Sequence, residues 1–245
     1  MAAATERARP TRLSRLLCAA EPRGSIDAVE ALLRAAPDMD VQAIALVGDL
    51  AGGGDGDRTA QFRALFRALG GSGVDTYWVP GPADAPISDY LREAYNVEIA
   101  YPFLHGVHGT IAFAPGTVLV AGFGGEVADD LDAERDEQSR LRYPRWEAEY
   151  RLKLLERELP GHEEEILLFA TPLAHKGDGT PGSEALAELT ATHRARVVVT
   201  GGERGSRLLG RTLVIAPGPL ADGCYAIADL HSRTAEMSTL SARAR

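Results

Sequence analysis

The chain has 245 residues, of which 45% are hydrophobic and 25% are charged, and its formal net charge is -9. Length and composition are typical of a globular α/β protein with a substantial core. The excess of acids excludes nucleic acid as the main partner, because binding to a phosphate backbone needs a basic face. The only two cysteines, Cys18 and Cys224, exclude a disulfide framework and a cysteine-based zinc site.

The ends of the chain are predicted to lie outside the folded core. Residues 1–14 are polar and lack the apolar segment of a secretory signal, so we expect a disordered tail there. No segment approaches the ~18 consecutive apolar residues of a membrane-spanning helix. We therefore expect one folded domain over 15–232, a second tail over 233–245, no membrane partner and a cytoplasmic location.

The first part of the chain predicts alternating strands and helices. Residues 16–20 and 41–47 are apolar runs typical of buried strands. Between them, Ser25 is expected to cap a helix whose apolar residues follow a helical period. A strand, a helix and a second strand in this order predict a parallel pair.

The second strand ends in Gly48 and Asp49, which places a carboxylate at its carboxyl end. In open α/β sheets ligands bind at that edge, so Asp49 is a candidate functional residue. A helix with an apolar face is then expected to stop at Gly70 and Gly71. The third strand, over 76–79, leads to a turn that ends in Asp84.

The second half of the chain predicts more strands. Residues 110–113 and 118–121 form a predicted hairpin. Further strands are predicted at 166–169, 197–199, 212–215 and 225–228, and helices at 146–159 and 184–190.

Five polar or glycine-rich turns each follow an apolar run. They are Glu21–Gly24, Gly48–Asp49, Gly81–Asp84, Ala170–Pro172 and Gly201–Arg204. Their order and spacing resemble the calcineurin-like metallophosphoesterases, which carry Asp-x-His, Gly-Asp, Gly-Asn-His-Asp/Glu, a lone His and Gly-His-x-His at these turns. The resemblance implies an α/β fold, a four-layer αββα sandwich of two mixed sheets, with all five turns at one edge. It also implies two divalent ions that activate a water for phosphoester hydrolysis.

The chain departs from the family pattern at most ligand positions. The bridging acid is kept as Asp49, the acid after the catalytic histidine is kept as Asp84, and Glu21 stands at the first aspartate position. The remaining ligand positions hold residues of other types: Arg23, Pro82, Ala83, Ala170, Gly202 and Arg204. Proline and alanine have no ligating side chain, and arginine brings a positive charge to a cation site. Longer strings such as Leu141–Trp146 resemble a degenerate, ligand-poor bacterial branch of the family.

The favoured interpretation is a pseudo-phosphoesterase without a cofactor, in which the cleft binds an anionic ligand or a partner. Three basic residues lie at or beside lost histidine positions: Arg23, Lys176 and Arg204. We expect them to pair with the remaining acids and to bind a small anion such as a phosphoester.

Two alternatives remain open at this stage. The first is a phosphoesterase with an all-oxygen site, in which Glu21, Asp49 and Asp84 hold one magnesium, manganese or calcium ion. In that interpretation Asp49, Asp84 and His175 are catalytic, with His175 as a ligand or proton donor. The second is a homo-oligomer subunit whose cleft is vestigial.

Overall fold

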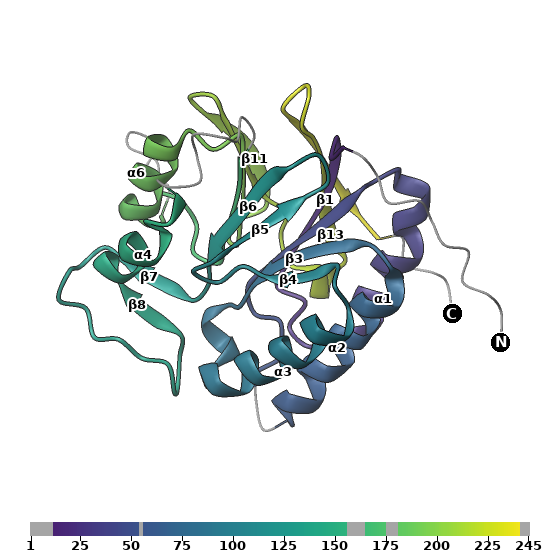
Figure 1. The fold of residues 1–245 in the computed structure, drawn as a ribbon, viewed down its shortest axis with the longest axis horizontal. Helices are drawn as coiled ribbons and strands as arrows, with labels where there is room; N and C mark the ends of the chain where they lie inside the picture. The colour runs from purple at the N-terminus through teal and green to yellow at the C-terminus, as the bar shows by residue number, and fades with distance from the viewer. Residues whose placement is uncertain (1–11, 54–55, 156–164, 175–180, 241–245) are drawn as a thin grey trace.

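The computed structural model describes residues 12–53, 56–155, 165–174 and 181–240. Two six-stranded sheets face each other, and helices cover the outer face of each (Figure 1). The four-layer αββα sandwich predicted from the sequence is therefore confirmed.

The first sheet has the strand order β14-β13-β1-β2-β3-β4. In that order its strands are Thr234–Thr239, Cys224–Asp229, Arg15–Ala20, Ala43–Val47, Asp75–Val79 and Leu104–Gly106. Strands β1 to β4 are parallel, whereas β13 runs antiparallel to β1 and to β14.

The second sheet has the strand order β11-β12-β10-β9-β6-β5. In that order its strands are Gly205–Leu209, Thr212–Ala216, Val197–Thr200, Glu165–Phe169, Val118–Phe123 and Ile111–Ala114. Its four inner strands are parallel, and both edge strands are antiparallel to their neighbours. A separate parallel pair joins β7 (Glu126–Ala128) to β8 (Arg142–Pro144).

In the described part of the chain, three helices pack on the first sheet and two on the second, and Figure 1 shows them on the outer faces. The first group is α1 (Ile26–Ala35), α2 (Arg58–Ser72) and α3 (Ile87–Ala100), and the second is α4 (Arg145–Leu152) and α6 (Glu184–His193). Short 3-10 turns occur at η1 (Ala36–Met39), η2 (Pro82–Asp84) and η4 (Leu220–Asp222).

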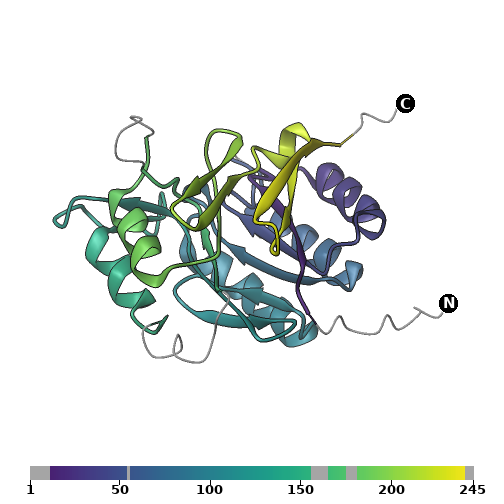
Figure 2. The same cartoon turned by 90° about the horizontal axis from the view of Figure 1, so that it is seen from above.

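Successive side chains of a strand point to opposite faces of its sheet, so each central strand contributes to two apolar layers. In β1, Cys18 faces the apolar layer between the sheets, together with Val199 of β10, and Leu17 faces the helices. Figure 2, seen from above, shows the helices on opposite outer sides of the two sheets. Strands covered on both faces are continuously apolar, as the sequence of β2 is.

Two details of the predicted helices are wrong. Helix α2 continues through Gly70 and Gly71 to Ser72 and is capped by Gly73, which has a left-handed φ of 68°. Gly70 is needed for packing, because a Cβ there would lie 2.6 Å from the Tyr101 ring. Ser25 precedes α1, but its side chain makes no capping hydrogen bond.

Several elements were not predicted from the sequence. Helix α3 and strands β4, β7, β8 and β11 lie in segments without a predicted element. The predicted tail after residue 232 is wrong over Thr234–Thr239, because β14 pairs with β13 along its whole length. At the other end, Leu13 is buried and its amide donates to Pro115, so the ordered chain starts before residue 15.

The predicted helix over 146–159 corresponds to the shorter α4, and residues 156–164 lie outside the described part. Residues 1–11 and 241–245 also lie outside it. Within the described part, each helix is too short or too polar to span a bilayer.

Phe66 on α2 should carry much of the packing between the helices and the first sheet. Its ring lies 5.0 Å from that of Trp78 and is 2% exposed. Phe66→Ala should lower the free energy of unfolding by about 3–5 kcal/mol, as a cavity forms that the sheet cannot fill. Denaturant unfolding measures this.

Phe113 on β5 is the matched control, because its side chain is 48% exposed. Phe113→Ala should cost less than about 1 kcal/mol. Equal losses in the two variants would contradict the packing described for Phe66.

Candidate functional site

The five strand-end turns meet at one edge of the sandwich, as the sequence predicts. The Arg23 amide donates to the Asp49 carbonyl at 2.9 Å, which joins the first turn to the second. The Gly202 amide lies 3.5 Å from Glu21 Oε1, which joins the first turn to the fifth. A Cβ on Gly48 would lie 3.6 Å from Cβ of Ala170, so the fourth turn lies beside the second.

Asp49 lies at the centre of this edge, where its backbone is closely packed but its side chain is partly exposed. A Cβ on Gly81 would lie 1.9 Å from the Asp49 amide nitrogen, so only glycine fits there. The Asp49 backbone is left-handed, with φ 37°, and its Oδ1 accepts a hydrogen bond from the Ala83 amide at 2.9 Å. The turn after β3 is thus packed directly on Asp49.

Asp84 is fully buried, and its carboxylate accepts hydrogen bonds from backbone amides. Its Oδ2 accepts from the amides of Leu50 at 2.8 Å and Gly81 at 2.7 Å. Its Oδ1 accepts from the Ala51 amide at 2.8 Å. Burial raises the pKa of Asp84 to about 7, although these three hydrogen bonds oppose the rise, and the nearby charge of Asp49 adds to it. Both carboxylate oxygens therefore hold the turns after β2 and β3 together.

Glu21 and Arg23 form an ion pair within the first turn. The side chain of Glu21 is 17% exposed and that of Arg23 is 51% exposed. Both residues have left-handed backbones, with φ of 49° and 48°. The expected pairing of Arg23 with an acid of the site is confirmed.

Arg204 has different partners from those expected. Its guanidinium donates to the Ser238 carbonyl at 2.8 Å and lies 3.4 Å from Thr239 Oγ1, both on β14. Its aliphatic stem covers Gly218, where a Cβ would lie 3.1 Å from Arg204 Cβ. The expectation that Arg204 pairs with one of the three acids is therefore wrong. The two other predicted residues, His175 and Lys176, lie outside the described residues.

A cavity of about 460 Å³ adjoins the fifth turn. Its polar lining includes Glu203, Arg204 and Arg207, and the Arg207 guanidinium donates to the Leu173 carbonyl at 2.9 Å. This cavity continues the strand-end surface beyond Gly201 and Gly202.

The donor set does not fit a two-ion metal centre. Both carboxylate oxygens of Asp84 already accept hydrogen bonds from backbone amides, and Glu21 already forms an ion pair with the Arg23 guanidinium. Pro82, Ala83 and Ala170 offer no side-chain ligand. Among the described residues no group of three or more His, Cys, Asp or Glu side chains could hold a metal ion.

Sequence reasoning missed the role of His108. Its Nδ1 accepts a hydrogen bond from the Gly124 amide at 2.9 Å, next to the turn after β3. Its ring packs 4.8 Å from Phe123 and 5.4 Å from Tyr143. Burial, with a smaller contribution from Arg151, lowers the pKa of His108 to about 3, which keeps it neutral. His108 and Tyr143 are distant in the sequence, so their contact follows only from the tertiary fold.

Two facing mixed sheets with a polar site at their carboxyl edge define a class of α/β proteins that bind ligands at strand ends. A family model described as "Metallophosphoesterase, calcineurin superfamily" matches residues 55–240. The chain belongs to this family of metallophosphoesterases.

Solved structures are similar over almost the whole chain. The crystal structure of TT1561 of Thermus thermophilus is 40% identical with a TM-score of 0.87, covering 94% of this chain and 100% of that one. A second structure is 26% identical with a TM-score of 0.81 and the same coverage of both chains.

A 5'-nucleotidase from Candida albicans SC5314 is 10% identical with a TM-score of 0.59, covers 96% of this chain and 53% of that chain, and shares the fold. No match was found among proteins of curated function.

The raised pKa of Asp84 predicts a pH-dependent stability. The folded state, with a pKa of about 7 against 3.8 for the unfolded group, binds the proton more tightly. The contribution of Asp84 to the unfolding free energy is therefore largest below about pH 4 and falls as pH rises to about 7, by a few kcal/mol. In Asp84→Asn this dependence should be absent, as denaturant unfolding across that range would measure.

His108 and Glu165 titrate in both proteins. The difference in unfolding free energy between the wild type and Asp84→Asn therefore isolates the contribution of Asp84. As pH rises, the unfolding free energy of the wild type should fall relative to that of the variant. A difference that moves in favour of the wild type would mean that the three amide hydrogen bonds outweigh burial.

Proposed function

We propose that this chain is a pseudo-phosphoesterase that keeps the metallophosphoesterase fold and uses its strand-end surface to bind an anionic ligand. The main support is the ion pair of Arg23 with Glu21, which places a guanidinium at a family metal-ligand position. A fixed positive charge disfavours a divalent cation beside it by Coulomb repulsion. No divalent ion is therefore part of this proposal.

The partners of two of the three remaining acids support the same proposal. In the family, metal ions balance the carboxylates at the strand ends. Here Arg23 balances Glu21, and three amides stabilise Asp84. Carboxylates that are partly buried without such partners would be costly.

Anion binding would use the remaining donors of Arg23. A guanidinium has five N–H donors, and the contact with Glu21 involves only Nη2. Its half-exposed position leaves other N–H groups open to a phosphate or carboxylate. Lys176 and Arg204 are further candidates in this proposal, which also assigns the protein to the cytoplasm and to a ligand-poor branch of the family.

A second function, a phosphoesterase with a single ion, has one observation in its favour. Asp49 is partly exposed at the centre of the site, and its Oδ2 accepts no hydrogen bond from the described residues. This oxygen could bind magnesium, manganese or calcium if Arg23 released Glu21. The two functions differ in whether phosphoesters are hydrolysed.

Phosphoester hydrolysis should be absent. Wild-type protein purified without chelator should turn over para-nitrophenyl phosphate and its bis-ester no faster than the metal-ion blank. The reason is that Ala83 stands where the family places the histidine that protonates the leaving group. The assay measures para-nitrophenolate release with magnesium, manganese, calcium and zinc.

Asp49→Asn is the control for a real but unusual site. Rapid turnover in the wild type that is lost in Asp49→Asn would overturn the pseudoenzyme proposal and establish the single-ion enzyme. Turnover that survives in Asp49→Asn would indicate a contaminating phosphatase and would be removed by further purification before comparison.

Arg23→Gln should weaken the binding of inorganic phosphate by about tenfold, as a charge-assisted hydrogen bond is worth ~1.5–3 kcal/mol. The unfolding free energy should fall by about 1 kcal/mol, because Arg23 is half exposed but Glu21, which is 17% exposed, loses its charged partner. Isothermal titration calorimetry and denaturant unfolding measure the two effects.

Arg34→Gln is a matched control on α1, since Arg34 also pairs with a glutamate, Glu30, and is exposed. It should bind phosphate as the wild type does. Equal binding by all three proteins would remove Arg23 from the proposed site.

A further inference from the structure

A basic pocket lies at the opposite edge of the sandwich from the strand-end site. It has a volume of about 790 Å³, within the range of small-ligand sites. Its lining includes four arginines and a histidine: Arg194, Arg196, Arg211, Arg233 and His231. No carboxylate residue is among the described residues that line it.

The topology places these bases together. Arg196 directly precedes β10 and Arg211 directly precedes β12, so both lie at the amino ends of parallel strands. Arg194 follows α6, and His231 and Arg233 lie in the turn between β13 and β14. The pocket thus joins the second sheet to the first at the edge away from Asp49.

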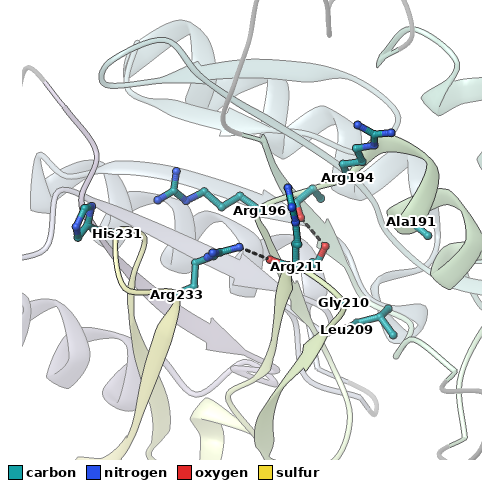
Figure 3. A pocket seen from close by; sticks show the side chains of 10 residues that line it. Ala191, Arg194, Arg196, Leu209, Gly210, Arg211, His231 and Arg233 are labelled. Carbon is teal, nitrogen blue, oxygen red and sulfur yellow. Dashed lines mark hydrogen bonds between the residues drawn. The ribbon is translucent and has the colours of Figure 1, made fainter.

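Backbone contacts hold part of the pocket in place. The Arg196 Nε donates to the Leu230 carbonyl at 2.7 Å, which ties the start of β10 to the end of β13. The Arg233 Nη1 donates to the Arg211 carbonyl at 3.1 Å. In Figure 3, Arg211 stands between Arg194 and Arg233, and Arg196 extends toward His231.

The charge of Arg194 and Arg211 is not balanced by any described carboxylate. Both residues are exposed, and neither forms a salt bridge or side-chain hydrogen bond with the described residues. The nearest acid along the β13–β14 turn is Asp229, whose Oδ1 accepts from the amide and hydroxyl of Ser232. Gathering like charges without a counter-charge is unfavourable unless an anion neutralises them.

We propose that this pocket binds a small ligand that carries several phosphate groups. Arginine guanidinium groups match phosphate oxygens in geometry and charge, and several of them around one cavity favour a multiply charged anion over a single phosphate. The net charge of -9 and the confined shape favour a small oligophosphate over a nucleic acid, which needs an extended basic face. Leu209 and Ala191 give the pocket an apolar side where a nucleoside could pack.

Titration calorimetry with inorganic triphosphate at moderate salt tests this site. The wild type should show saturable binding that weakens as salt is raised, because the contacts are exposed to solvent. The double variant Arg194→Ala with Arg211→Ala should bind at least tenfold more weakly. Both side chains are exposed and without described partners, so the variant should unfold at the wild-type denaturant concentration.

Matched controls separate this site from general electrostatics and from the strand-end site. Arg34→Ala with Arg67→Ala removes the same charge from helices α1 and α2 and should bind triphosphate as the wild type does. Arg23→Gln should also leave triphosphate binding unchanged. Failure of the proposed anion site at Arg23 would therefore not affect this result.

A parallel titration with a nucleoside triphosphate distinguishes the sources of the oligophosphate. Equal affinity would mean that only the phosphates are recognised, and tighter binding would mean that the apolar side takes part. The proposal is overturned by absence of triphosphate binding, by equal binding in the Arg194 and Arg211 double variant, or by binding only to a duplex oligonucleotide.

Discussion

Two of the three hydrogen bonds accepted by Asp84, those from the Leu50 and Ala51 amides, join the turn after β3 to the turn after β2. The first and fourth turns pack against the second turn, and the fifth contacts the first. The arrangement depends on close backbone approach, since Gly81 leaves no room for a side chain beside Asp49. A buried carboxylate that accepts backbone amides can hold two irregular segments in register where no strand pairing is possible. This contact therefore fixes the turns after β2 and β3 relative to each other.

The same contact explains how the edge can keep its shape through backbone interactions alone. Asp84 does not rely on a metal for its partners, because backbone amides surround it. Arg23 supplies the positive charge next to Glu21. The fold at this edge is thus held by backbone and glycine contacts, whereas any chemistry depends on the side chains placed there.

The sequence predicted the parts of the fold that depend on local pattern and on order along the chain. Apolar runs located the central strands, and the spacing of the five turns predicted their convergence. Strand β14 was missed because its sequence is mostly polar and none of its side chains is buried, so it lacks the apolar run that located the central strands. The partners of Arg204 and the basic pocket could not be read from the sequence either, since they join turns from both sheets. Charge balance favoured a carboxylate partner for Arg204, but its guanidinium donates to a main-chain carbonyl of β14 instead.

The hydrogen bond of Arg204 to the Ser238 carbonyl also makes the site edge mechanically dependent on the outermost strand. Strand β14 has β13 on one side, and its other side is the open end of the first sheet. Open strand edges accept a further strand from another chain, and they are the first to separate when a sheet is pulled or frays. Peeling β14 away would release Arg204 and, with it, the turn beside Gly202. Force on β14, or a further strand added to its open edge, would therefore affect the turn at Gly202 in the second sheet.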